Sequence, residues 1–548
     1  MTQIQIYDTT LRDGAQREGL TLSVEDKVKI ARQLDRLGIP WIEGGWPGAN
    51  PKDGEFFRRL KLEPLTQSEV VAFCSTRRPG GLAAEDKMLA AILAAGTKWV
   101  TIFGKSWDLH VTEGLKTNLG ENLEMIRDSI EYLVSQGRRV IYDAEHWFDG
   151  YQANPEYALQ TLKTAISAGA DWLVFCDTNG GTLPQDITRI VGEVVKSLGY
   201  PLGTRIDPNK QLQFGIHPHN DCELAVANAI AAVTSGVTMV QGTINGYGER
   251  CGNANLCSII PNLQLKLGYS CITPPNLTRL TQVSRYISEV VNVAPNDYAA
   301  FVGKCAFSHK GGIHVSAVER NPLTYEHIAP TQVGNERRIA ISEQSGLSNV
   351  LIKASEMGLT LTKADPRTRQ ILTRLKELEY QGYQFEGAEA SFELLMREIL
   401  GQTSTLFTIQ DFQVHCSILP GRDYANATQH HSLATIKIAV DGQNILEAAE
   451  GNGPVSALDA ALRKALSQFY PELNKCYLTD YKVRIIDGAE GTSAVTRVLV
   501  ESSNGLHRWT TIGVSDNILE ASYQAVAQGI EYGLLVRSPQ TCNLVDAK

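Results

Sequence analysis

The feature that most constrains the fold is a regular alternation of short apolar runs and stretches with helical periodicity in the first half of the chain. One helical stretch, SVEDKVKIARQLDRLG, opens with a capping-box pair at Ser23 and Asp26. Strands that alternate with helices pair in parallel through crossovers, and eight such units in roughly 250–280 residues predict a closed (β/α)8 barrel rather than an open sheet. The eight predicted strands are IQIYD, WIEGG, VVAFC, WVTIF, RVIYDAE, WLVFCDT, LQFGIHPH and MVQGTING.

The remaining sequence differs in pattern and predicts further domains. A chain of 548 residues is too long for one ordinary core. We predict a barrel over 1–272, a helical region over 273–404 and an α+β domain over 405–548. The last contains two similar segments, HSLATIKIAVDGQNILEAAEGNGPVSALDAALRKAL and TSAVTRVLVESSNGLHRWTTIGVSDNILEASYQAVAQGI. Each predicts a β-β-α unit, so this domain is interpreted as duplicated, serving either dimerisation or ligand sensing.

Composition excludes several classes of protein. Apolar residues make up 43% of the chain and charged residues 20%, as in soluble globular proteins. A net charge of -9 with scattered Lys and Arg argues against a nucleic-acid partner. The N-terminal residues lack a signal-peptide pattern, and no apolar run predicts a membrane span. Ten dispersed cysteines without a C-x-x-C pair indicate reduced thiols, so we expect a cytoplasmic protein without a membrane partner.

Polar residues cluster where five of the predicted barrel strands end. They lie in YDTTLRDG, DAEHW, CDTNGG, HPHND and NGYGERCGN. Active sites of such barrels lie at the carboxyl ends of the strands. We therefore expect these segments to form one site.

Four of these residues suit a divalent metal ion. His217 and His219 stand two apart, so their side chains project to one face of a strand. In a closed barrel, Asp13 and Asn253 would lie beside them, because the eighth strand pairs with the first. A carboxylate, two imidazoles and an amide oxygen suit Mg²⁺, Mn²⁺, Co²⁺ or Zn²⁺. The alternative is a pair of ordinary hydrogen-bonded histidines.

Two charged residues are further candidates at this rim. Arg12 precedes Asp13 and could stabilise a developing oxyanion, or could form a structural salt bridge. Glu145 ends the fifth predicted strand and could orient a base or water, or could pair with a cation of the barrel.

Three motifs together carry a family resemblance. DTTLRDGAQ, GIHPHND and NGYGERCGNANL resemble the acyl-CoA-condensing barrels of the isopropylmalate, homocitrate and citramalate synthases. AEGNGPVSALDAALRKAL resembles the regulatory domain of the first and last of these. IEGGWPGANPKDGEFF, YDAEHWFDGY, CDTNGG and HKGGIHVSAVERNPLTYEHI are most similar to the citramalate branch.

The resemblance implies an acyltransferase that condenses acetyl-CoA with pyruvate and water to give (R)-citramalate and CoA. This reaction would open a threonine-independent route to isoleucine. It further implies a homodimer, a divalent metal cofactor and isoleucine as an effector of the C-terminal domain.

The resemblance also implies roles for individual residues. Asp13, His217 and His219 match metal ligands, and Asn253 matches a position near the metal. Arg12 matches the residue that polarises the keto oxygen. Thr178 matches a threonine that binds the keto-acid carboxylate, and His110 and Glu145 match polar residues of the pocket. Asp143 stands where relatives carry small or aromatic residues, and is a candidate for contact with the keto-acid side chain.

Two catalytic matches lie outside the barrel strands. His314 matches a histidine supplied by the helical region, usually of the neighbouring subunit, and is the candidate base. Tyr325 is a weaker match to a catalytic tyrosine. The chain departs from its relatives at Ser316, where an acid is common, so another group must orient His314.

Three other functions remain open at this point. An isopropylmalate synthase runs the same chemistry on 2-ketoisovalerate, and two methyl groups leave little trace in one sequence. A lyase of the same barrel group would cleave a hydroxyacyl-CoA. A non-catalytic amino-acid sensor would retain the barrel only as a scaffold.

Overall fold

The computed structural model describes residues 2–199, 212–402, 406–418, 430–487, 491 and 494–535. They form two compact units, 1–307 with 327–337, and 308–326 with 338–548. Each unit is described separately.

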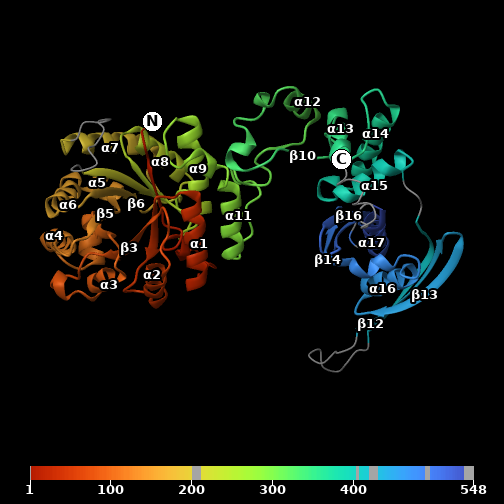
Figure 1. The fold of residues 1–548 in the computed structure, drawn as a ribbon, viewed down its shortest axis with the longest axis horizontal. Helices are drawn as coiled ribbons and strands as arrows, with labels where there is room; N and C mark the ends of the chain where they lie inside the picture. The colour runs from red at the N-terminus through yellow and green to blue at the C-terminus, as the bar shows by residue number, and fades with distance from the viewer. Residues whose placement is uncertain are drawn as a thin grey trace. The chain divides into compact units, whose positions relative to one another are not determined.

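The first unit is built on a closed barrel of eight parallel strands in sequential order, which confirms the predicted fold (Figure 1). β1 pairs with both β2 and β8, so the first and last strands close the barrel. The strands are β1 Gln5–Asp8, β2 Trp41–Gly45, β3 Glu69–Ser75, β4 Trp99–Lys105, β5 Arg139–Glu145, β6 Trp172–Asp177, β7 Gln213–Pro218 and β8 Met239–Gly242.

Helices cover the outside of the barrel, and their ends follow local sequence signals. Ser23 and Asp26 form the predicted capping box at the start of α1. Gly38 ends α1 in the left-handed conformation, with φ 82°, which a glycine adopts without strain. The helices around the barrel are α1 Val24–Leu37, α2 Pro51–Leu62, α3 Lys87–Ala95, α4 Leu119–Ser135, α5 Trp147–Ala153, α6 Pro155–Ala168, α7 Pro184–Ser197, α8 Ala225–Thr234 and α9 Leu256–Pro261.

The barrel interior changes from aromatic to polar along the strands. Trp41 and Trp99 begin their strands and meet edge to face, with ring centroids 4.7 Å apart. With Trp172 they belong to a buried apolar cluster inside the barrel. Polar residues follow towards the carboxyl ends, so the interior is filled on one side and can hold a site on the other.

Two helices after the barrel pack on it. α10 Pro274–Leu277 and α11 Leu280–Val290 contribute Leu277, Leu280 and Ile287 to the main core of the first unit. The helical region predicted to begin at 273 therefore includes helices that pack with the barrel. The domain boundary at 272 and 273 stays a prediction.

The second unit begins with residues 308–326. They contain a helix, α12 Gly312–Arg320, with Val315 and Val318 buried. These two apolar residues lie at helical spacing, and α12 contacts α13 Leu347–Glu356. α14 Pro366–Tyr380 and α15 Glu389–Ile399 complete the helical part.

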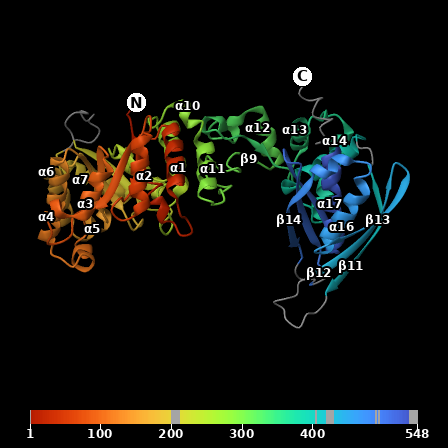
Figure 2. The ribbon, with the colours of Figure 1, turned by 60° about the horizontal axis from the view of Figure 1, so that its bottom comes forward.

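The C-terminal part has the duplicated architecture predicted, with one more strand in each copy. β11 Thr408–Ile418, β12 His430–Val440 and β13 Gln443–Gly451 precede α16 Pro454–Leu466. β14 Tyr477–Ile485, β15 Thr496–Ser503 and β16 Arg508–Ser515 precede α17 Ile518–Leu535. Each helix packs on its own antiparallel sheet, and α16 contacts α17 (Figure 2). The predicted boundary at 404 and 405 lies outside the described residues.

A search of the described helices for a membrane-crossing segment, which must be both long and strongly apolar, finds none.

Candidate functional site

Asp13, His217 and His219 meet at the carboxyl end of the barrel. Oδ2 of Asp13 lies 3.1 Å from Nε2 of His217 and 3.8 Å from Nε2 of His219. The two imidazole rings are 5.2 Å apart, and all three residues are buried. These three residues offer ligand atoms that lie within 4.8 Å of one another. The predicted convergence of strands one and seven is therefore present.

Asn253 lies beside this group. Its Nδ2 is 3.2 Å from Oδ2 of Asp13 and 3.1 Å from Nε2 of His217. A backbone bridge to His219 fixes the segment. Gly248 is required next to it, because a Cβ there would lie 1.9 Å from Oδ1 of Asn253. The glycine lets the loop after β8 approach the amide.

Two buried polar residues, Gln241 and Asp143, orient His217. Its Nδ1 is 2.7 Å from Oε1 of Gln241, a buried residue of β8. Nε2 of Gln241 donates to Oδ1 of Asp143 over 3.1 Å. Because Gln241 accepts a hydrogen bond from Nδ1, the proton of the neutral imidazole lies on Nδ1. The lone pair then lies on Nε2, the nitrogen that faces Asp13.

The charge states of Asp13 and His219 suit a cation. Burial alone would raise the pKa of Asp13, but Arg12 and His217 hold it well below its usual range. Burial lowers the pKa of His219 to about 4, so this imidazole is neutral at pH 7. The buried atoms Oδ1 of Asp13 and Oδ1 of Asn253 find no hydrogen-bond partner among the described residues. An anionic carboxylate, neutral imidazole nitrogen and unpaired oxygens fit a divalent ion.

Arg12 is held by a carboxylate that was not among the predicted site residues. Its Nε donates to Oε1 of Glu43 over 2.5 Å, and Nη1 lies 3.4 Å from Oδ2 of Asp13. Glu43 also accepts hydrogen bonds from Tyr7 and Thr9 and is fully buried. The available signal was a carboxylate inside the apolar run WIEGG.

The site opens into a cavity of about 210 Å³. Three aromatic rings form part of its lining, with Trp46 edge-on to Phe73 and Phe103 at 5.9 and 5.7 Å. The Arg12 guanidinium lies 3.8 Å from the centroid of Phe73. The other lining residues include Asp13, Asp143, Glu145, Thr178, His217, His219 and Arg250.

Thr178 and Glu145 have definite partners beside this cavity. The Thr178 hydroxyl oxygen accepts the backbone N–H of His146 over 2.9 Å, which leaves its O–H for a ligand. Glu145 forms an ion pair with Lys105, which agrees with the expectation that it could pair with a cation of the barrel. His110 does not line the cavity; its ring stacks on Trp107 and lies 4.0 Å from the ring of His146.

His314 and Tyr325 belong to the second unit. Their rings are 4.3 Å apart, and both residues are exposed. The Tyr325 ring is thus a neighbour that can orient His314 where Ser316 replaces an acid. His314 and Tyr325 therefore lie next to each other, but they belong to the second unit and not to the unit that contains the barrel.

Three family models match successive parts of the chain. Residues 3–287 match the HMGL-like family model. Residues 301–382 match a homocitrate synthase post-HMGL domain-like model, and residues 386–534 match the LeuA allosteric (dimerisation) domain.

Curated relatives span the chain. A protein of Synechocystis named (R)-citramalate synthase is 67% identical over 545 residues, covering 100% of this chain and 98% of the relative. One of the same name from Geobacter sulfurreducens is 50% identical, covering 97% and 98%. A probable 2-isopropylmalate synthase of Methanopyrus kandleri is 30% identical over 528 residues, covering 96% and 98%. The chain therefore belongs to the (R)-citramalate synthase family of the HMGL-like proteins.

Proposed function

We propose that this enzyme condenses acetyl-CoA with pyruvate and water to give (R)-citramalate and CoA. The observation that carries the proposal is the meeting of Asp13, His217 and His219 beside Arg12 in a small cavity. The 67% identical relative carries the name of this activity, and the isopropylmalate synthase relative stands at 30%.

The cavity residues suggest how the keto acid binds. The Thr178 O–H can donate to the pyruvate carboxylate, and Arg12 can donate to its keto oxygen. Glu43 restrains the guanidinium, so little reorganisation is needed when negative charge develops. The three aromatic rings leave space for a small keto-acid side chain. Asp143 lines the same space, so we propose that it contacts this part of the substrate.

A divalent ion held by Asp13, His217 and His219, with Asn253 beside it, would polarise the keto carbonyl and offset the negative charge on its oxygen. The residues present fit Mg²⁺, Mn²⁺, Co²⁺ or Zn²⁺.

The condensation needs a base for the acetyl methyl group. We assign it to His314, supported by Tyr325, whose ring lies against it. The base takes a methyl proton, the resulting carbanion forms a C–C bond to the keto carbon, and the keto oxygen is protonated. Water then cleaves the thioester and releases CoA as a thiol. Glu145 and His110 are proposed as polar groups around these steps.

The finer assignments concern assembly and regulation. The match to the LeuA allosteric (dimerisation) domain supports a homodimer, in which His314 of one subunit serves the barrel of its partner. We further propose that the enzyme opens a route to isoleucine, works in the cytoplasm and is inhibited by isoleucine.

A free-thiol assay with several keto acids tests the proposed function. Acetyl-CoA with pyruvate should release CoA faster than acetyl-CoA with 2-ketoisovalerate, and EDTA should abolish release. Faster turnover of 2-ketoisovalerate would assign the chain to isopropylmalate synthesis. No release with any keto acid, in enzyme supplied with each of the four ions, would favour a sensor.

A further inference from the structure

Two residues at the mouth of the barrel have a left-handed backbone although neither is glycine. His146, which directly follows β5, has φ 54°, and Arg250, in the loop after β8, has φ 56°. A residue with a Cβ adopts this conformation only at a cost in free energy, so neighbouring contacts must hold it there. Strained positions of this kind cluster at functional sites. The contacts of His146 and Arg250 therefore indicate what the two residues support.

Both residues form hydrogen bonds to Thr178, which directly follows β6. The backbone N–H of His146 donates to Oγ1 of Thr178 over 2.9 Å, and Nη2 of Arg250 donates to the Thr178 carbonyl oxygen over 2.6 Å. The first bond fixes the hydroxyl oxygen, and the second fixes the main chain that carries it. Loops from β5 and β8 thus hold the side chain and the backbone of the same residue.

The imidazole of His146 is held by packing and by a carboxylate. The centroid of its ring lies 4.0 Å from that of His110, and its Nδ1 lies 3.2 Å from Oδ2 of Asp149. Nδ2 of Asn179 donates to the same oxygen of Asp149 over 3.0 Å. Asp149 therefore joins His146 to the residue that follows Thr178, so the left-handed turn and the Thr178 segment are fixed together.

The guanidinium of Arg250 is held by Asp221, in the loop after β7. Its Nε and Nη2 donate to the two carboxylate oxygens over 2.7 and 2.9 Å, a bidentate pair that fixes the plane of the guanidinium. Gly180 lets this pair approach the Thr178 segment, because a Cβ at Gly180 would lie 2.5 Å from Oδ2 of Asp221. Arg250 is thereby oriented by the protein itself.

We propose that His146 and Arg250 are positioning residues that hold Thr178 in the orientation needed to bind the keto-acid carboxylate. Because the Thr178 oxygen already accepts the His146 N–H, its own O–H is left to donate to a ligand. Restraint of the Thr178 main chain by Arg250 removes motion that binding would otherwise have to freeze. The inference rests on the proposed function, which assigns the carboxylate to Thr178.

A double-mutant cycle separates positioning from direct contact with substrate, which is the alternative for Arg250 because it lines the cavity. Thr178→Val removes the hydroxyl, and Arg250→Met removes the donors but keeps an unbranched side chain. Each should raise the KM for pyruvate about 10-fold, while kcat and the KM for acetyl-CoA change less than about threefold. In the Thr178→Val background, Arg250→Met should change the pyruvate KM less than about twofold.

Effects that multiply in the double variant would show that Arg250 binds the substrate itself, and would overturn its positioning role. Arg189→Met is the matched control, because Arg189 pairs with Asp186 on α7 and lies outside the cavity lining. It should keep the KM of the parent. A kcat close to that of the parent shows that each variant is folded.

Two further variants test the left-handed backbone of His146. Alanine disfavours this conformation, so His146→Ala should move the N–H away from Thr178 and raise the pyruvate KM about 10-fold. Asparagine adopts it more readily, so His146→Asn should stay within about threefold of the parent. Lys116→Gly is the control, since Lys116 has the same φ of 54° at an exposed position outside the cavity lining. Equal values in all these proteins, or equal losses in both His146 variants, would overturn the role of the His146 N–H.

Calorimetry with oxamate, a pyruvate analogue that keeps the carboxylate, measures the same cycle without turnover in enzyme supplied with Mn²⁺. A parent that releases CoA, with variants that keep its pyruvate KM and oxamate affinity, would contradict only this inference. A parent that shows the expected cycle with oxamate but releases no CoA would contradict only the proposed reaction. A parent that neither binds oxamate nor releases CoA would overturn both.

Discussion

Oδ2 of Asp13 lies 3.1 Å from Nε2 of His217, although one residue follows the first barrel strand and the other belongs to the seventh. The contact exists because β8 pairs with both β1 and β7. Closure of the barrel and assembly of the proposed metal site are therefore the same structural event, and the predictions below test the groups around it.

Gln241 should control metal affinity through His217. Gln241→Met removes the acceptor of the His217 Nδ1–H, so we expect metal affinity to fall about 10–100-fold. Competition with a chelating dye measures this without turnover. Gln5→Met is the matched control, because Gln5 bonds Trp41 at the other end of the barrel. Equal affinities in the parent and Gln241→Met would contradict the orienting role.

Arg12 should act on the transition state. Arg12→Lys keeps a positive charge but loses the planar set of donors held by Glu43, so we expect kcat to fall about 10²–10³-fold. CoA release under saturating pyruvate measures the change. Arg17→Lys, at a residue stacked on Tyr247 and outside the cavity lining, should retain activity. A kcat within twofold of the parent would remove Arg12 from the proposed mechanism.

Asp143 should make a contribution to the stability of the metal-free enzyme that is lost as pH rises. Burial raises the pKa of this carboxyl to about 7 from its ordinary value of 3.8. Between these pH values the folded chain binds more protons than the unfolded chain, so the free energy of unfolding decreases as pH increases. One pKa unit corresponds to about 1.4 kcal/mol.

Asp143→Asn should reduce this loss. Thermal unfolding at pH 5 and pH 8 in EDTA measures it, and the drop in Tm between the two should be smaller in the variant. Asp8, whose pKa burial also raises to about 7, should keep part of the effect in both proteins. A drop as large in Asp143→Asn as in the parent would show that Asp143 is ionised throughout.

The proposed sharing of His314 between subunits predicts complementation. His314→Ala should lose about 10²–10⁴-fold in kcat if this residue is the base. Asp13→Asn should be inactive because it loses the anionic ligand. Co-expression of the two variants should restore part of the activity, since a mixed dimer would retain one intact pair of Asp13 and His314.

Two controls accompany that experiment. A chain carrying both substitutions, expressed alone, should remain inactive, and His507→Ala, at an exposed residue near the start of β16, should have normal activity. No activity on co-expression of the two variants, with both folded and dimeric, would show that each subunit uses its own histidine.

The sequence alone determined the barrel and the residues at its rim. Apolar runs that alternate with amphipathic helices have few compact solutions, and parallel strands bring their carboxyl ends to one edge. For that reason Asp13, His217, His219 and Asn253 could be predicted as neighbours before any contact was known. The duplicated C-terminal unit was also visible, because each copy repeats the same order of strands and helix.

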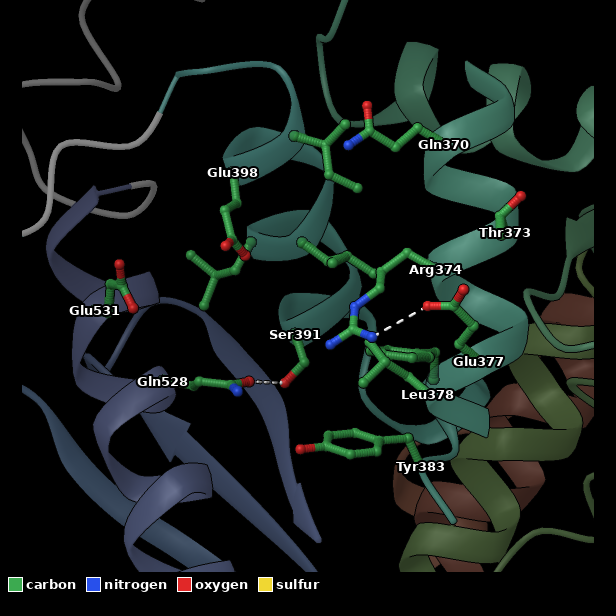
Figure 3. Close-up of a pocket in the computed structure, with 14 residues that line it drawn as sticks. Gln370, Thr373, Arg374, Glu377, Leu378, Tyr383, Ser391, Glu398, Gln528 and Glu531 are labelled. Carbon is green, nitrogen blue, oxygen red and sulfur yellow. Dashed lines mark hydrogen bonds and ion pairs between the residues drawn. The ribbon is translucent and has the colours of Figure 1, made fainter. Parts of the chain in front are cut away.

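Only the tertiary structure decided which side chains support the residues at the rim of the barrel. Glu43 and Gln241 look like single polar residues in apolar strands, and their partners come from elsewhere: Arg12 follows β1 and His217 lies in β7. Such contacts depend on strand register and on barrel closure, which place residues side by side that are distant in sequence. A cavity of the second unit has the same origin (Figure 3). Arg374 and Glu531 line it together only because α14 and α17 both pack against α15. Local sequence sets the period of each element, whereas contacts between elements are set by how their buried faces pack.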